Sequence, residues 1–167
     1  MVDTNFIYGP IDGIRTLMAN SAAFRTAVSA ATVNDAKGVI YWFEGMDDEY
    51  DASNTAAARP RVILSYEWNN TKKTGVRNWL SDYAVNADFE FPLTDNSHQT
   101  SSKALMSTVN TVVSEMLAVE GVNDGTTAHP EITRVENAPG VIVVDPDDTE
   151  GGERFLWFGV RFIKEIE

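Results

Sequence analysis

The alternation of apolar and polar residues over positions 82–91 is the feature that most constrains the fold of this chain. The apolar set is Tyr83, Val85, Ala87, Phe89 and Phe91, and the intervening set is Asp82, Ala84, Asn86, Asp88 and Glu90. Successive side chains of a β-strand point to opposite faces, so the pattern predicts a strand with one buried and one solvated face. Pro92 is expected to end it. Such a strand belongs to a sheet that packs its apolar face against another layer.

Two other segments place apolar residues at helical spacing. The first covers residues 11–31 and the second covers residues 100–119. In each, the apolar residues fall on one side at about 100° per residue, which predicts an amphipathic helix. Pro10 suits the first turn of the first helix, where a backbone amide would have no partner. Gly121 occupies the place of a left-handed cap after the second helix.

Short apolar runs predict the remaining strands. They cover residues 39–43, 62–68, 132–135, 141–144 and 154–166. In the last run both alternate sets are largely apolar, so we expect it to be covered on both faces. The order is therefore helix, three strands, helix and further strands. It predicts a single α+β domain over residues 1–167, with a mixed or antiparallel sheet packed on two amphipathic helices.

Two connections are long or strongly acidic. Residues 45–58 show no usable period, and connections beyond about 12 residues are uncommon in compact domains unless they are functional or flexible. Residues 145–152 form a turn rich in Asp and Glu. We expect the connection over residues 45–58 to be a contact element.

The charge and composition exclude several classes of function. The chain has 13 Lys and Arg against 25 Asp and Glu, a net charge of −12. This sign opposes specific binding to nucleic acid, which requires cations to replace phosphate counterions. The chain has no Cys, which excludes disulfides, thiolate chemistry and zinc fingers and fits a reducing compartment. No segment resembles a signal peptide or a membrane span, so no membrane partner is expected.

No catalytic or metal-binding motif is present. The acids of residues 145–153 invite a calcium site, but Glu stands where the EF-hand loop requires Gly, so a solvated turn is the better interpretation. His98 precedes the second helix among capping residues, and His129 is interpreted as a loop residue. We therefore expect no enzyme, no cofactor and no metal. Asp88 and Glu90 are the carboxylates that a small hydrolase or isomerase would use.

Aromatic residues are abundant, with four Trp, five Tyr and eight Phe. Core packing accounts for most of them. A strand that is apolar on both faces exceeds what two helices cover, and aromatic residues are enriched where proteins meet. These observations favour a homo-oligomer.

The layout resembles the tail terminator and tail-completion proteins of long-tailed bacteriophages, of the minor tail protein U type. The resemblance lies in the opening helix, in the residues Arg59-Pro60-Arg61-Val62-Ile63-Leu64, in the strand ending Phe89-Glu90-Phe91, in the amphipathic helix after it, and in the closing residues 156–162. It implies a ring, typically hexameric, that caps the tail tube, stops its polymerisation and offers a surface for head attachment. The implied partners are further copies, the tail tube protein and the head–tail connector. The implied location is the head-proximal end of the virion tail, and the host cytoplasm during assembly.

An acidic ring would let DNA pass without binding it, because its charge repels phosphate. We expect contacts between subunits at Asp47, Asp48, Glu49, Tyr50, Arg59, Arg61, Trp68, Asp147, Asp148 and Glu150. Three alternatives remain open at this point. They are another neck or head–tail connector component, a small acidic α+β enzyme, and an acidic inhibitor that mimics DNA.

Overall fold

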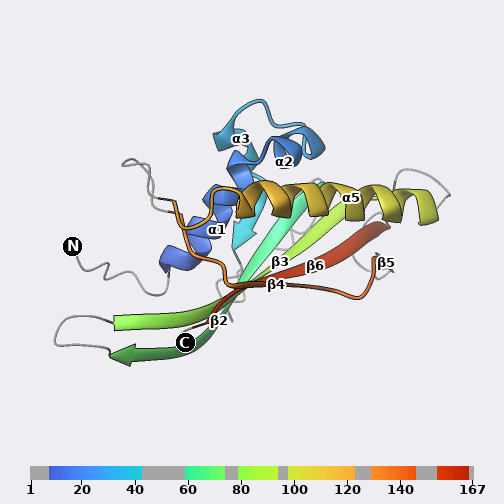
Figure 1. Ribbon diagram of the computed structural model, residues 1–167. Helices are drawn as coiled ribbons and strands as arrows, with labels where there is room; N and C mark the ends of the chain where they lie inside the picture. The colour runs from blue at the N-terminus through green and yellow to red at the C-terminus, as the bar shows by residue number, and fades with distance from the viewer. Residues whose placement is uncertain are drawn as a thin grey trace.

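Six strands form one mixed sheet, and the helices lie together on one of its faces (Figure 1). The structure is a computed structural model that describes residues 8–42, 59–73, 79–93, 98–122, 129–145 and 154–165. The helices are α1 (Tyr8–Asn20), α2 (Ala22–Ala27), α3 (Val33–Lys37) and α5 (His98–Leu117). The strands are β1 (Ile40–Trp42), β2 (Arg61–Lys73), β3 (Trp79–Pro92), β4 (Arg134–Asn137), β5 (Ile142–Val144) and β6 (Phe155–Lys164). The α+β fold expected from the pattern is confirmed.

The strand order is β1-β2-β3-β6-β4, with β5 also paired to β6. β1 runs parallel to β2, and every other pair is antiparallel. β2 therefore lies between two strands, although Pro60 at its start suggests an edge position. β4 and β5 follow the same edge of β6, where residues 138–141 bulge out opposite residues 158 and 159. Residues 137–140 include Asn, Pro and Gly, which are typical of turns, yet this segment does not reverse the chain.

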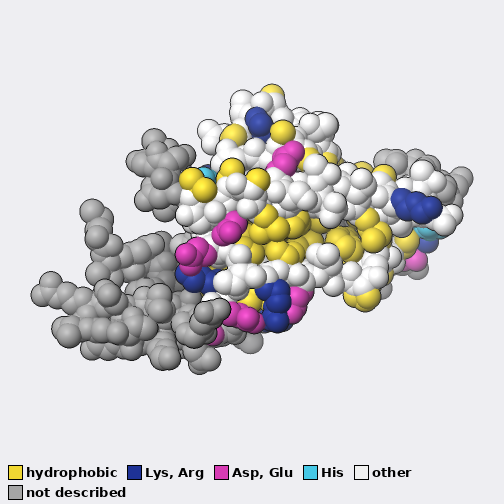
Figure 2. Space-filling view, viewed as in Figure 1, with side chains coloured by type: hydrophobic (Ala, Val, Ile, Leu, Met, Phe, Trp, Pro, Cys, Tyr) yellow, Lys and Arg dark blue, Asp and Glu magenta, His cyan; other side chains and the backbone are white. Residues whose placement is uncertain are grey.

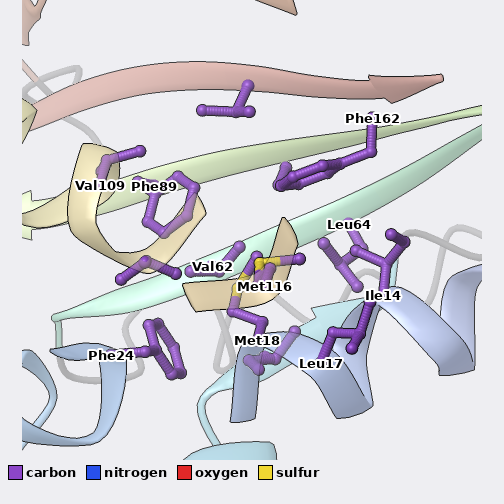
Figure 3. Packing of buried hydrophobic residues seen from close by; sticks show 14 of the residues in the cluster. Ile14, Leu17, Met18, Phe24, Val62, Leu64, Phe89, Val109, Met116 and Phe162 are labelled. Atoms are coloured by element: carbon purple, nitrogen blue, oxygen red, sulfur yellow. The ribbon is translucent and has the colours of Figure 1, made fainter. Parts of the chain in front are cut away.

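The core lies between the sheet and the helices. The apolar set of the alternating strand faces the helices, and Phe89 stands opposite Val62 on β2 and Phe158 on β6. Figure 3 shows Ile14, Leu17 and Met18 of α1, Phe24 of α2 and Met116 of α5 packed toward these strands. Each of these helix residues is at most 1% exposed. Full burial of such a side chain stabilises the fold by about 1.5–3 kcal/mol.

The N-terminal helix is divided, which corrects the prediction of one helix over residues 11–31. α1 ends at Asn20, and Ser21 begins α2 as its N-cap by accepting a hydrogen bond from the Phe24 amide at 3.0 Å. Ser29 then takes a positive φ of 55°, and a capping box at Thr32 begins α3. The described helices are consequently three short ones and α5, instead of the two expected.

The hairpin of β2 and β3 is longer than its apolar pattern suggests. β2 continues to Lys73 through Asn69 and Asn70, which are residue types common in turns, and Lys73 pairs with Trp79. β6 pairs with β3 only from Tyr83 onward. Among the described residues, the part of β3 that precedes Tyr83 therefore pairs with β2 alone. This two-stranded end of the hairpin extends away from the helices in Figure 1.

Candidate functional site on the outer face of the sheet

The face of the sheet that points away from the helices, here called the outer face, collects the polar set of the alternating strand. In one row Ile63 of β2 stands beside Asp88 of β3, which stands beside Gly159 of β6. In the next row Arg61 pairs with Glu90 and Glu90 with Trp157. On this face β6 is buried at its ends, at Phe155 and Ile163, and only partly buried between them, so the cover expected on both sides of this strand is incomplete.

Two arginines converge on one carboxylate at the start of β2. Glu90 Oε2 accepts hydrogen bonds from Nε of Arg61 at 2.7 Å and from Nε of Arg59 at 3.1 Å. The side chains of Arg61 and Glu90 are only 4% and 10% exposed. The guanidinium of Arg59 also lies 3.6 Å from the ring centroid of Phe155, a cation–π contact. Because Arg61 stands directly opposite Glu90, the register of the hairpin creates this cluster.

Beside this cluster, Trp157 lies across Gly159. A Cβ atom at Gly159 would come within 2.9 Å of the indole ring, so glycine is required there for the ring to pack on the strand. The Trp157 side chain donates a hydrogen bond to Asp88. Burial raises the pKa of the Asp88 carboxyl, the indole hydrogen bond lowers it in part, and the charge of Glu90 raises it further.

A shallow depression of about 370 Å³ is open on this face. Its lining includes Ser65, Asn86, Asp88, Glu136, Trp157 and Arg161. Neither histidine belongs to the lining, and the described residues hold no group of three or more His, Cys, Asp or Glu suited to a metal ion. Hydroxyl, amide, carboxylate, indole and guanidinium groups together suit hydrogen bonding to a polar chain segment, as in the contact of two protein surfaces.

A second surface lies where α5 meets the edge of the sheet. α2 packs on one side of α5, along a groove lined by Ala23, Ser107 and Thr111. The opposite side of α5 and the neighbouring edge carry the band of apolar side chains seen in Figure 2, here called the apolar strip. We define it by Met106, Val113 and Leu117 of α5 with Val135, Val141 and Val143 of the edge. Met106 and Leu117 are 44% and 41% exposed.

The sequence-predicted contact residues divide into three groups. The structure brings Arg59 and Arg61 together at Glu90. It places Trp68 opposite Tyr83, toward the end of the hairpin. The others lie outside the described residues: Asp47, Asp48, Glu49, Tyr50, Asp147, Asp148 and Glu150.

Glu90, Phe155 and Trp157 were missed as members of this cluster. Glu90 was singled out from the sequence as a possible catalytic acid, whereas the structure surrounds it with arginine. The signal that could have found its partners is the pairing register of β2 with β3, which places Arg61 opposite Glu90.

In the described ranges, no helix combines the length and the apolar character that a membrane crossing requires. No model of a known protein family matches the chain, and no curated protein matches it.

Proposed function

We propose that this protein is a structural subunit that assembles into a ring, terminates the tail tube of a long-tailed bacteriophage and offers the surface to which the head is joined. The observation that carries the proposal is the two-stranded end of the hairpin. Residues Thr71–Lys73 pair with residues 79–81 and, among the described residues, with no other strand. A two-stranded hairpin is marginally stable alone in water, and its unpaired edges invite a partner.

The remaining surfaces differ from one another, as a ring requires. The outer face is polar and charged around Arg59, Arg61 and Glu90, whereas the apolar strip follows α5 and the sheet edge. A ring forms when one surface of a subunit contacts a different surface of the next and the rotation closes. A symmetric dimer needs one self-complementary surface and leaves the others unused.

The net charge of −12 supports a ring around a DNA channel. A wall that repels phosphate lowers the affinity for passing DNA, since nonspecific binding to DNA depends on cations that displace counterions. No sequence recognition is needed for such a role.

The test uses the purified chain and tail tubes assembled from the tube protein of the same genome. We expect electron micrographs to show a ring at one end of each tube, and tubes that stop lengthening once the chain is added. Tubes incubated with albumin serve as the control and should continue to grow. Tubes that grow equally in both samples contradict the proposal. Binding to the head–tail connector without binding to tubes would identify a neck component instead.

A further inference from the structure

Gly159 leaves a hollow on the outer face, because it has no side chain to cover the strand at this point. A Cβ atom at Gly159 would lie 2.9 Å from the Trp157 ring and 3.4 Å from Asp88 Oδ1. The indole and the carboxylate therefore meet beside the glycine, and both line the depression of about 370 Å³. Pockets that hold small ligands begin at about 300 Å³, so this depression is large enough for one side chain of a partner.

Asp88 brings a negative charge to this depression. Among the described residues, no Lys or Arg forms an ion pair with it: the two arginines at the start of β2 contact Glu90, and Arg161 contacts Glu136 at 3.9 Å. Burial raises the pKa of the Asp88 carboxyl, and the hydrogen bond from Trp157 lowers it only in part. Within the described part of the chain, the charge of Asp88 is therefore incompletely compensated.

The rest of the lining supplies hydrogen-bonding groups without an excess of positive charge. Ser65, Asn86, Arg161 and Glu136 follow one another in a single row from β2 to β4. In this row Asn86 Nδ2 donates to Ser65 Oγ at 3.5 Å. Because Arg161 and Glu136 balance each other, Asp88 leaves the lining with a net negative charge.

We infer that this depression binds the guanidinium group of an arginine that belongs to a partner protein docked on the outer face. A guanidinium is a planar fork of N–H donors with a positive charge, and it matches carboxylate, hydroxyl and amide oxygens. It is weakly hydrated and packs on aromatic rings, and Trp157 supplies the ring here. Arginine is accordingly enriched where proteins meet.

The charge of the whole chain favours such a partner. The chain carries a net charge of −12, so a protein surface that presents arginine is attracted to it and oriented by it. An ammonium group is a compact and strongly hydrated point charge, which suits a flat aromatic and polar lining less well. The inference goes beyond the proposed function, because a pocket for arginine serves any partner that docks on this face, with or without a ring.

The first experiment titrates the protein with N-acetyl-arginine methylamide and follows the indole N–H resonance of Trp157 by NMR. The variant Trp157→Phe identifies that resonance. We expect a dissociation constant on the order of 1–10 mM, since one side chain in a shallow site gives little affinity. The citrulline analogue, which has a similar shape and no charge, should bind at least about tenfold more weakly. The lysine analogue should also bind more weakly than the arginine probe.

Asp88→Asn is the decisive variant, because it removes the charge and keeps an oxygen that can accept the hydrogen bond from Trp157. We expect the arginine probe to bind this variant at least about tenfold more weakly. Since burial of Asp88 opposes its ionisation, the neutral Asn should leave the protein folded, which circular dichroism checks. Asp12→Asn, at an exposed position of α1, changes the net charge equally and should bind the probe as the unaltered chain does.

A blocked peptide Gly-Arg-Gly and free arginine distinguish a partner protein from a small molecule. We expect the peptide to bind at least as tightly as the single-residue probe, because Ser65 and Asn137 of the lining can bond to its flanking amides. Free arginine should bind more weakly, since Asp88 and Glu136 repel its carboxylate.

Four results overturn the inference. One is a Trp157 resonance that does not shift with the arginine probe up to about 50 mM, where even a weak site is occupied. Another is equal binding of the citrulline or the lysine analogue, which would show that the depression does not select a guanidinium. The third is unchanged affinity of Asp88→Asn for the arginine probe. The last is tighter binding of free arginine than of the peptide, which would assign the depression to a small molecule.

Discussion

Glu90 joins Arg59 and Arg61, and its removal leaves two guanidinium groups of the outer face without their shared carboxylate. Breaking a buried ion pair by deleting one partner costs about 3–5 kcal/mol, because an uncompensated charge remains. We expect Glu90→Ala to lower the free energy of unfolding by about this amount, measured by urea denaturation. Asp12→Ala, at an exposed position of α1, should change the same quantity by less than about 0.5 kcal/mol. A loss below 1 kcal/mol at Glu90 would show that the pair is solvated.

Gly159 is a second position where adding a single methyl group would change the local packing. In Gly159→Ala the added methyl group meets the Trp157 ring at 2.9 Å, so the indole must move from the strand and weaken its bond to Asp88. We expect a loss of about 1–3 kcal/mol in the free energy of unfolding and an altered near-ultraviolet dichroism of tryptophan. Gly140→Ala is the matched control, since a Cβ there meets nothing within 4 Å. Equal effects of the two substitutions would contradict the packing of Trp157 on Gly159.

At the scale of elements, Ser21 links α2 to α5. Its hydroxyl caps α2 and donates to Glu115 Oε2 at 2.7 Å, and the Ala23 amide donates to the same oxygen at 3.2 Å. These bonds, led by that of Ser21, hold the pKa of Glu115 below its ordinary value. Because the folded pKa lies below the unfolded one, the linkage stabilises the fold above the unfolded pKa and is lost as the pH falls through the folded pKa.

Ser21→Ala should therefore lower the free energy of unfolding at pH 7 by about 1–2 kcal/mol, from the lost cap and the lost bond to Glu115. The deficit should shrink in acid, once Glu115 is protonated in both proteins, to the part that belongs to the cap. Urea denaturation of both proteins at pH 7 and at a series of lower pH values measures the deficit at each pH. A deficit that stays constant across these pH values would show that the pKa of Glu115 does not depend on its hydrogen bond from Ser21.

Local periodicity predicts the elements whose burial follows one face over many residues. It finds the alternating part of β3 and the helix α5 because Val85, Phe89, Val109 and Met116 each repeat a pattern within their own segment. It misses the break after α1, since the partner of Ser21 lies 94 residues away in sequence.

The same reasoning explains which parts of β2 and of the site escape the sequence. The polar residues of β2 through Lys73 show no apolar period, and cross-strand pairing with β3 makes them a strand. Arg59 and Arg61 stand out as cations among acids, but their partner Glu90 becomes visible only when the register of the hairpin is known.

At the scale of the whole molecule, net charge and charge placement act on assembly in opposite directions. Copies that each carry −12 repel, and at 0.01 M salt the Debye length of about 30 Å lets that repulsion act between whole subunits. At 0.15 M the length falls to about 8 Å, so distant charges are screened while charges in contact still attract. At 1 M it is about 3 Å, and the contact itself weakens.

Self-association should therefore be strongest near 0.15 M salt and weaker at both 0.01 M and 1 M. Sedimentation velocity at the three salt concentrations measures this directly. Association that rises steadily to 1 M would indicate that burial of the apolar strip drives assembly and that charge only opposes it.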